Sequence, residues 1–196
     1  MKSRYLETIK AIDGKIYNLS FHQERYEGVL KSLGVTQFKR LQEYLNPPSH
    51  DMYRCRLVYT KDSIEVTYHL YKKREIKSLK LVYENNIIYN QKNEDRKNID
   101  LLFLNKENAD DVLIIKNNLV TDTSVANVAF FDGSRWMTPA KPLLEGTTRA
   151  RLLEEGKIFA RDISVNDLKN YTNIALLNAM IDFDILSPKN IGDFYC

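Results

Sequence analysis

The chain has 196 residues, of which 43% are hydrophobic and 28% are charged, and its formal net charge is +3. This composition excludes a disordered polar tail and a collagen-like protein, because enough apolar residues are present to bury a core. The charge is too small and too mixed to indicate nucleic acid as a partner. The N-terminal residues are polar and no window is apolar enough to cross a bilayer, so we expect a soluble, cytoplasmic protein.

The first half of the chain predicts a strand hairpin, two helices and a second hairpin. Turns are expected at Asp13-Gly14 and Lys61-Asp62, between segments in which apolar and polar residues alternate. The first helix is expected to begin at Ser20, a common N-cap residue, and to end at Gly34. The predicted strands cover residues 5–12, 16–19, 53–60, 64–71 and 79–84, and the predicted helices cover 20–33 and 36–45.

The second half has longer apolar strands and a different order of elements. A hairpin is expected to turn at Asp132-Gly133-Ser134, and a helix is expected to start just after Gly146. The predicted helices cover residues 93–108, 147–157 and 164–171, and the predicted strands include 111–116, the hairpin 127–140 and 173–180. These patterns predict an α+β chain with two domains, residues 1–85 and 86–196.

Cysteine and histidine give no sign of a metal site. Cys55 and Cys196 are far apart in the sequence and predict neither a disulfide framework nor a ligand pair. His22, His50 and His69 lie in a helix, a Pro-rich loop and a strand, without the spacing that metal ligands show. We therefore expect no bound metal.

Two polar segments have the residue types of a binding site. Gly146, Thr147 and Thr148 precede an apolar helix, where unpaired backbone N–H groups and the helix dipole favour an anion. Asp122 lies among hydroxyl side chains in a turn between two apolar strands. Taken alone, the first segment is more often an ordinary helix start and the second an ordinary hairpin turn.

The order and spacing of these pieces resemble the class IV aminotransferase family, the fold-type IV pyridoxal-phosphate (PLP) enzymes. That family includes branched-chain and D-amino-acid aminotransferases and 4-amino-4-deoxychorismate lyase. Residues 5–34 are also similar to the family's F-E-T and H-x-x-R-L segments. The matching positions downstream are Thr121, Asp122, Asn127, Gly133, Thr138, Pro139, Leu144, Gly146 and Arg149.

The resemblance implies a two-domain, D-amino-acid aminotransferase-like α+β fold, with PLP as cofactor and a homodimer as the assembly. It implies that Lys92 is the lysine that condenses with the PLP aldehyde, with Arg96 as the following arginine of the motif. By composition alone, Lys97, Lys106 and Lys116 compete with Lys92, and only the position within the motif selects it.

The resemblance also implies which residues hold the cofactor. Arg25 matches the arginine that binds the PLP phosphate, since a guanidinium donates in a planar fork. Thr147 and Thr148 resemble a second phosphate contact, and Asn178-Ala179 resembles a pair found near the phosphate of the lyases. Without the motif, an exposed helix arginine and a structural asparagine at the end of a strand are the simpler interpretations.

Asp122 departs from the family pattern. The family usually has glutamate here, bonded to the pyridine nitrogen, where a carboxylate keeps the nitrogen protonated. Aspartate has the same charge but is one methylene shorter. We expect either that the cofactor lies slightly deeper or that a water molecule intervenes.

The N-terminal domain is expected to be truncated, because the chain starts close to Leu6-Glu7-Thr8 and lacks the long Gly-rich loop of many aminotransferases. Recognition of a substrate carboxylate by the usual residues is therefore in question. Arg54 and Arg56 lie on one strand face and could bind such an anion; equally, they could be solubility charges on an edge strand.

The resulting hypothesis is a PLP-dependent lyase resembling 4-amino-4-deoxychorismate lyase, which forms 4-aminobenzoate and pyruvate. Lys92 would take a proton from the substrate, and Thr8 is the candidate proton donor to the leaving group. The alternatives are an aminotransferase of D- or branched-chain amino acids and a catalytically silent relative.

Overall fold

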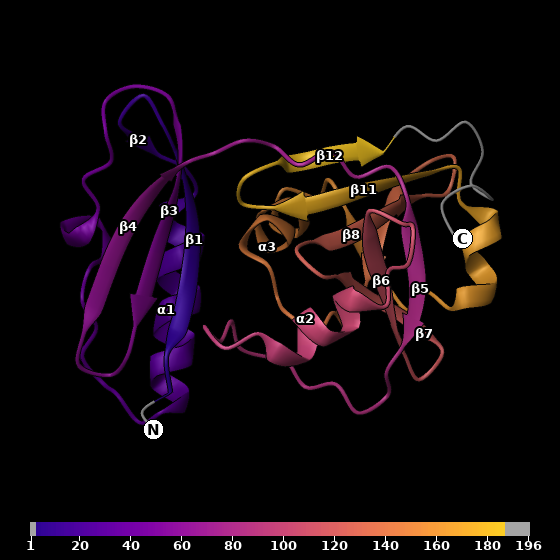
Figure 1. Cartoon of the computed structure of the whole chain (residues 1–196), viewed down its shortest axis with the longest axis horizontal. Coiled ribbons are helices and arrows are strands. Elements are labelled where there is room, and N and C mark those ends of the chain that lie inside the picture. Colours follow the sequence, from indigo (N-terminus) through magenta and orange to yellow (C-terminus); the bar gives the residue numbers. More distant parts are fainter. Residues whose placement is uncertain (1–2, 187–196) are drawn as a thin grey trace. The chain divides into compact units, whose positions relative to one another are not determined.

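The computed structural model describes residues 3–186, and the chain divides into two compact units (Figure 1). Unit 1 comprises Met1–Lys73 and Gln91–Asp95, and unit 2 comprises Arg74–Asn90 and Arg96–Cys196. The first unit thus ends at Lys73 rather than at residue 85, and a later segment returns to it. Backbone hydrogen bonds explain the return, because Leu6 N donates to Lys92 O and Glu94 N donates to Arg4 O.

Unit 1 is a four-stranded antiparallel sheet with the order β2-β1-β3-β4, and helix α1 lies along one face (Figure 1). Alternation places odd-numbered residues of β1 and β3 under the helix, where Ile9, Cys55 and Leu57 are fully buried. Even-numbered residues point to the opposite face. The elements are β1 Tyr5–Ile12, β2 Lys15–Ile16, α1 Leu19–Ser32, the 3₁₀ helix η1 Leu41–Tyr44, β3 Met52–Tyr59 and β4 Ile64–Leu70.

The two ends of α1 differ in how well the sequence predicts them. The expected start at Ser20 is wrong: the helix begins at Leu19, and the N-cap is Asn18, which takes a left-handed conformation with φ of 54°. The expected end at Gly34 is confirmed. Gly34 has φ of +81°, and Gly34 N and Val35 N donate to Lys31 O and Leu30 O, as in a Schellman motif.

The helix predicted over residues 36–45 is wrong, since only the short η1 forms there. Gln23 of α1 is the reason, because its side chain donates to Lys39 O and accepts from Leu41 N. These bonds hold the segment in an extended path, and Leu41 is fully buried against the sheet. A tertiary contact has therefore overridden a local helical pattern.

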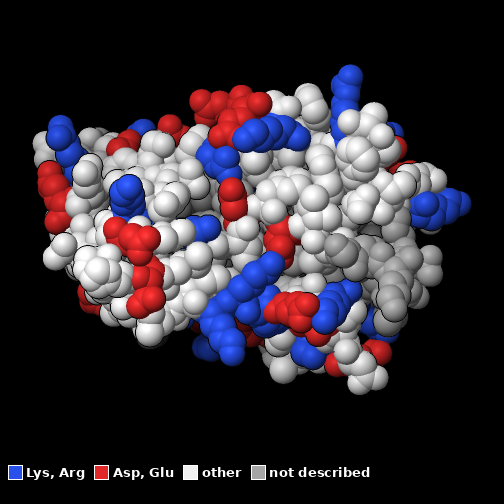
Figure 2. Space-filling model, turned by 90° about the horizontal axis from the view of Figure 1, so that it is seen from above, with Lys and Arg blue, Asp and Glu red and all other residues white. Residues whose placement is uncertain are grey.

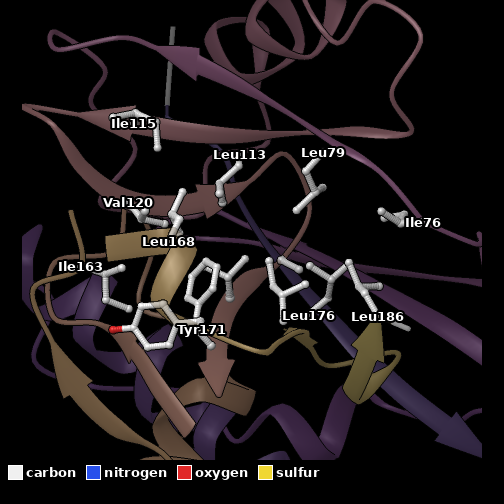
Figure 3. Packing of buried hydrophobic residues seen from close by; sticks show 14 residues of the cluster. Ile76, Leu79, Leu113, Ile115, Val120, Ile163, Leu168, Tyr171, Leu176 and Leu186 are labelled. Atoms are coloured by element: carbon white, nitrogen blue, oxygen red, sulfur yellow. The ribbon is translucent and has the colours of Figure 1, made fainter. Parts of the chain in front are cut away.

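Unit 2 contains an eight-stranded sheet in which β10-β9-β8-β7-β6-β5 are neighbours and β11 joins β8 to β12. Its main core gathers apolar side chains from the strands and from η2, pointing toward one another (Figure 3). The elements are β5 Leu79–Tyr83, α2 Lys97–Leu104, β6 Asp111–Lys116, β7 Leu119–Thr123, β8 Asn127–Phe131, β9 Trp136–Pro139, α3 Thr147–Glu154, β10 Phe159–Arg161, η2 Val165–Asn170, β11 Asn173–Asn178 and β12 Asp182–Leu186.

For unit 2, the kind of element, helix or strand, is predicted correctly more often than its bounds. The hairpin turn at Asp132-Gly133-Ser134 is confirmed, with Asp132 Oδ1 accepting from Ser134 N and Arg135 N. The helix predicted over 93–108 is shorter, because residues before Arg96 are extended along β1. The helix predicted over 164–171 is the 3₁₀ helix η2, closed by a capping box between Ser164 and Asp167. Strand β12 was not predicted.

Acidic and basic side chains alternate over the face shown in Figure 2, as expected for a chain with a small net charge. Within residues 3–186, no helix is long and apolar enough to cross a membrane. The described residues also contain no group of three His, Cys, Asp or Glu side chains placed to hold a metal ion. Cys55 is a buried free thiol, and Cys196 lies outside the described residues.

Candidate functional site

A buried ionic cluster in unit 1 is built around Glu7 of β1. Its carboxylate is fully buried and accepts hydrogen bonds from Arg25 Nε at 2.8 Å, Arg25 Nη2 at 2.5 Å and His22 Nδ1 at 2.6 Å. Both partners lie on α1, where their spacing of three residues puts them on one helix face. Burial alone would raise the pKa of Glu7, but the Arg25 charge and the hydrogen bonds lower it to about 2.

His22 is the neutral member of this cluster. Burial lowers the pKa of His22, the Glu7 hydrogen bond opposes that shift in part, and the charges of Arg25 and Lys92 lower the pKa further. An uncharged imidazole therefore donates its Nδ1 proton to Glu7.

Lys92 is held in place through its backbone. Lys92 O accepts from Leu6 N at 2.8 Å, and Asn93 forms a β-bridge with Tyr5. The two basic residues that the motifs single out, Arg25 and Lys92, therefore both belong to unit 1. The competing lysines Lys106 and Lys116 donate to the backbone carbonyls of Ala109 and Ile87 in unit 2.

Thr8, Arg54 and Arg56 lie on the other face of the unit 1 sheet. Thr8 is partly exposed and is paired across the strands with Arg56. Arg56 donates to Glu94 at 2.8 Å, and Arg4 donates to the same carboxylate at 2.5 Å. The edge-strand interpretation of the two arginines is wrong, because β3 lies between β1 and β4.

In unit 2, Asp122 occupies the end of β7 and is 5% exposed. Its Oδ1 accepts from Asn127 Nδ2 at 2.7 Å and its Oδ2 accepts from Leu144 N at 2.9 Å. Burial raises the pKa of Asp122 to about 6, although these hydrogen bonds and the Arg149 charge oppose the shift. The carboxylate is thus fixed in position by neutral donors, and the Arg149 charge only partly offsets the effect of burial.

Asn127 connects Asp122 to the start of α3. Its Nδ2 also donates to Leu144 O at 2.8 Å, so aspartate, asparagine and the Leu144 peptide form a closed set of hydrogen bonds. Gly146 passes so close that a Cβ atom there would lie 2.0 Å from Asn127 Oδ1. Only glycine fits at this position, which explains the glycine before the helix in terms of packing.

Helix α3 begins directly after Gly146 with two buried threonines. Thr147 and Thr148 are 5% and 1% exposed, and the first backbone N–H groups of a helix lack intrahelical partners. Arg149 is also buried; its Nη2 donates to Pro139 O at 2.8 Å, and its Nε has no hydrogen-bond partner among the described residues. This end of unit 2 therefore combines a helix N-terminus with a buried cation.

Asn178 and Ala179 lie at the end of β11, and the Asn178 side chain closes the turn to β12. Its Oδ1 accepts from Met180 N and Ile181 N, and its Nδ2 donates to Val125 O at 3.3 Å. The structure thus gives Asn178 a turn-forming role beside the β7–β8 turn.

Sequence reasoning missed three residues of these clusters: Glu7, His22 and Asn127 were not given site roles. Arg96, noted only as part of a motif, donates from Nη2 to Ser124 O at 2.6 Å and so holds the turn that follows Asp122. Glu7 could have been found from the sequence as an acidic residue at a position that strand alternation turns inward. A buried carboxylate requires a cation or hydrogen-bond donors, so that position predicts a partner.

Comparison with known proteins places this architecture in one family. The family described as "Amino-transferase class IV" matches residues 5–183. A Haemophilus influenzae protein of unknown function is 36% identical over 180 residues, covering 89% of this chain and 96% of the relative. The crystal structure of a "putative 4-amino-4-deoxychorismate lyase" from Haemophilus somnus is 35% identical, with a TM-score of 0.85 over 92% of this chain and 97% of that one.

More distant structures share the fold. The PLP-bound form of a Mycobacterium tuberculosis "hypothetical aminotransferase" is 16% identical, with a TM-score of 0.80, and the match covers 95% of this chain and 81% of that one. These matches agree with the family and fold that the motifs indicate. The chain belongs to the class IV aminotransferase family of fold-type IV enzymes, whose cofactor is pyridoxal 5′-phosphate.

Proposed function

We propose that this protein binds PLP and acts as a lyase on 4-amino-4-deoxychorismate, releasing 4-aminobenzoate and pyruvate. The observation that carries the proposal is the state of Asp122, a buried carboxylate held by neutral donors with its pKa raised to about 6. A protonated pyridine nitrogen supplies the positive charge that this carboxylate lacks. Aspartate therefore fits the role that glutamate has in the family.

The other residues fit the remaining groups of PLP. The phosphate is an anion, and Arg25 and the Thr147-Thr148 start of α3 are each, taken separately, suited to an anion. Lys92 is proposed as the amine for the aldehyde, and the cation Arg25 and His22 belong to the same unit. When bound, PLP supplies a ring that accepts electrons from a carbon that loses its proton.

Two side chains are proposed to move protons. Lys92, once neutral, can take the proton from the carbon that bears the substrate amine. Thr8 can donate a proton to the departing enolpyruvyl group, since it points away from α1 and the residue is partly exposed. Aromatisation of the ring favours the reaction.

The choice of a lyase is supported by two relatives. The Haemophilus somnus protein has the lyase name at 35% identity over nearly the whole chain. A Schizosaccharomyces pombe "putative aminodeoxychorismate lyase" is 38% identical over 77 residues, covering 36% of this chain and 33% of that one. We also propose that the protein is a cytoplasmic homodimer, as expected for the family; gel filtration with light scattering tests the dimer.

The test uses the purified protein loaded with PLP. Wild-type protein should keep a visible absorption band through exhaustive dialysis, and Lys92→Ala should lose it because the cofactor is then not covalently held. Lys169→Ala removes an exposed lysine of unit 2 and should leave the band unchanged. A protein that stays colourless would reject every PLP-dependent activity.

The reaction itself is tested with aminodeoxychorismate. Release of pyruvate and 4-aminobenzoate in equal amounts supports the lyase. Conversion of the cofactor to pyridoxamine phosphate on addition of D-alanine or leucine, without turnover of aminodeoxychorismate, would instead identify an aminotransferase. PLP binding with neither reaction would identify a silent relative.

A further inference from the structure

The face of the unit 1 sheet that points away from α1 has a row of basic residues directly opposite one another. Lys10 of β1 is in register with Arg54 of β3, and Arg54 is in register with His69 of β4. The neighbouring row is Thr8, Arg56 and Thr67. All six side chains have the parity that points away from α1.

Charge compensation differs sharply between the two rows. Glu65 and Glu94 reach this face and both are engaged: Arg4 contacts each of them, and Arg56 contacts Glu94. Within residues 3–186, neither Lys10 nor Arg54 has an acidic partner. Lys10 Nζ lies 5.9 Å from the Tyr17 ring centroid, and Arg54 is exposed.

This arrangement is unfavourable as a purely structural feature. Like charges directly opposite on neighbouring strands destabilise a sheet, and β3 is an interior strand, so protection of a sheet edge does not explain Arg54. A carboxylate bound between the ammonium and the guanidinium would relieve the repulsion. Side chains directly opposite start about 5 Å apart at Cβ, which lets both cations reach one anion.

We propose that Lys10 and Arg54 form a carboxylate-binding site, and that the substrate is a primary amine with a carboxylate remote from its amino group. The substrate class rests on the proposed function, because it takes Thr8 as the point of reaction. Thr8 and Lys10 are two residues apart on one strand face, which corresponds to about 7 Å. A ring with its amine and its carboxylate at opposite ends matches that span, and a simple α-amino acid does not.

The test is a binding titration that needs no turnover. 4-Aminobenzoate, with a carboxylate opposite the amine, and aniline, without the carboxylate, are titrated into the PLP-loaded protein and followed by calorimetry. Arg54→Gln should weaken 4-aminobenzoate binding by about 10-fold or more, the effect of losing a charge-assisted hydrogen bond, and Lys10→Gln should weaken it less. Aniline binding should not change in either variant.

Arg40→Gln is the matched control, because Arg40 is an exposed arginine of the same unit and lies outside the sheet; it should bind 4-aminobenzoate as wild type does. Equal binding of 4-aminobenzoate and aniline by wild-type protein, or wild-type affinity in Arg54→Gln, would overturn the site. The two proposals fail separately. Carboxylate-dependent binding without pyruvate release removes the lyase reaction alone, whereas pyruvate release with wild-type affinity in Arg54→Gln removes this site alone.

Discussion

The two units each bury a carboxylate, and they treat its charge in opposite ways. Glu7 in unit 1 faces a bidentate arginine and a histidine, and its pKa falls to about 2. Asp122 in unit 2 has an amide and a backbone N–H as partners, and its pKa rises to about 6. Depth of burial is therefore not what separates them, since both are at most 5% exposed.

The difference shows which carboxylate is available to a ligand. Glu7 has its charge neutralised within the protein and serves to fix Arg25 and His22 on α1. Asp122 is also held by hydrogen bonds, but its donors, the Asn127 amide and Leu144 N, carry no charge and do not neutralise it. A cation that arrives from outside, such as a protonated ring nitrogen, gains most from binding to Asp122.

The largest expected loss of stability comes from removing Glu7, the neutralised carboxylate of unit 1. Glu7→Ala leaves Arg25 without its buried counter-charge and should lower the free energy of unfolding by about 3–5 kcal/mol. Glu94→Ala is the matched control, because Glu94 also pairs with two arginines but on the surface, and it should cost at most about 1 kcal/mol. Urea unfolding at pH 7 measures both; similar losses would show that burial does not set the strength of the cluster.

A smaller effect tests Asp122 through pH. Its pKa is raised above the unfolded value of 3.8, so its contribution to stability is present below about pH 4 and is lost as pH rises through about 6. A shift of about two units corresponds to about 3 kcal/mol. Asp122→Asn should remove this slope from the cofactor-free protein between pH 4 and 7.

Bound PLP should also flatten the Asp122 slope, because its ring nitrogen compensates the charge. The contribution of Glu7 to stability has the opposite pH dependence. Because its pKa is lowered, Glu7 stabilises the protein above about pH 4.5, and this contribution is lost as the pH falls toward 2. Unfolding curves with and without PLP separate the two carboxylates. An unchanged slope in Asp122→Asn would contradict the account of unit 2.

The smallest expected effect concerns the packing that holds Asp122. Gly146→Ala places a methyl group 2.0 Å from Asn127 Oδ1, at a backbone conformation that alanine adopts freely, with φ of −74°. Overpacking should cost about 1–3 kcal/mol. Adding Asn127→Ala should recover part of that loss, which a double-mutant cycle measures. Gly28→Ala in α1 has open space around it and should be neutral or slightly stabilising; a similar loss there would reject the steric explanation.

Local patterns were sufficient to predict most strands and the residues of the motifs. Hairpin turns, the end of α1 at Gly34 and the inward face of β3 follow from residue type and alternation, which act over a few positions. The motifs also singled out Arg25 and Lys92, which lie in the same unit. The sequence did not reveal the partners, because Glu7 contacts residues 15 and 18 positions away on another element.

The errors have the same origin. The helix expected over residues 36–45 failed because Gln23, on a different element, hydrogen-bonds the extended backbone. The role of Asn178 as the residue that closes a turn depends on β12, a strand that the sequence pattern did not indicate. In both segments the local structure is set by contacts with residues distant in the sequence. The conformational preferences of single residues carry no information about such contacts.

The return of Gln91–Asp95 to unit 1 has a consequence for how the protein is made. The chain leaves unit 1 after Lys73, builds β5 of unit 2, and comes back with Lys92 before leaving again. On the ribosome, unit 1 is incomplete until residue 95 has emerged, by which time part of unit 2 is already outside. No single cut therefore yields both units complete, because a cut after Asp95 keeps Lys92 with unit 1 but removes Arg74–Asn90 from unit 2.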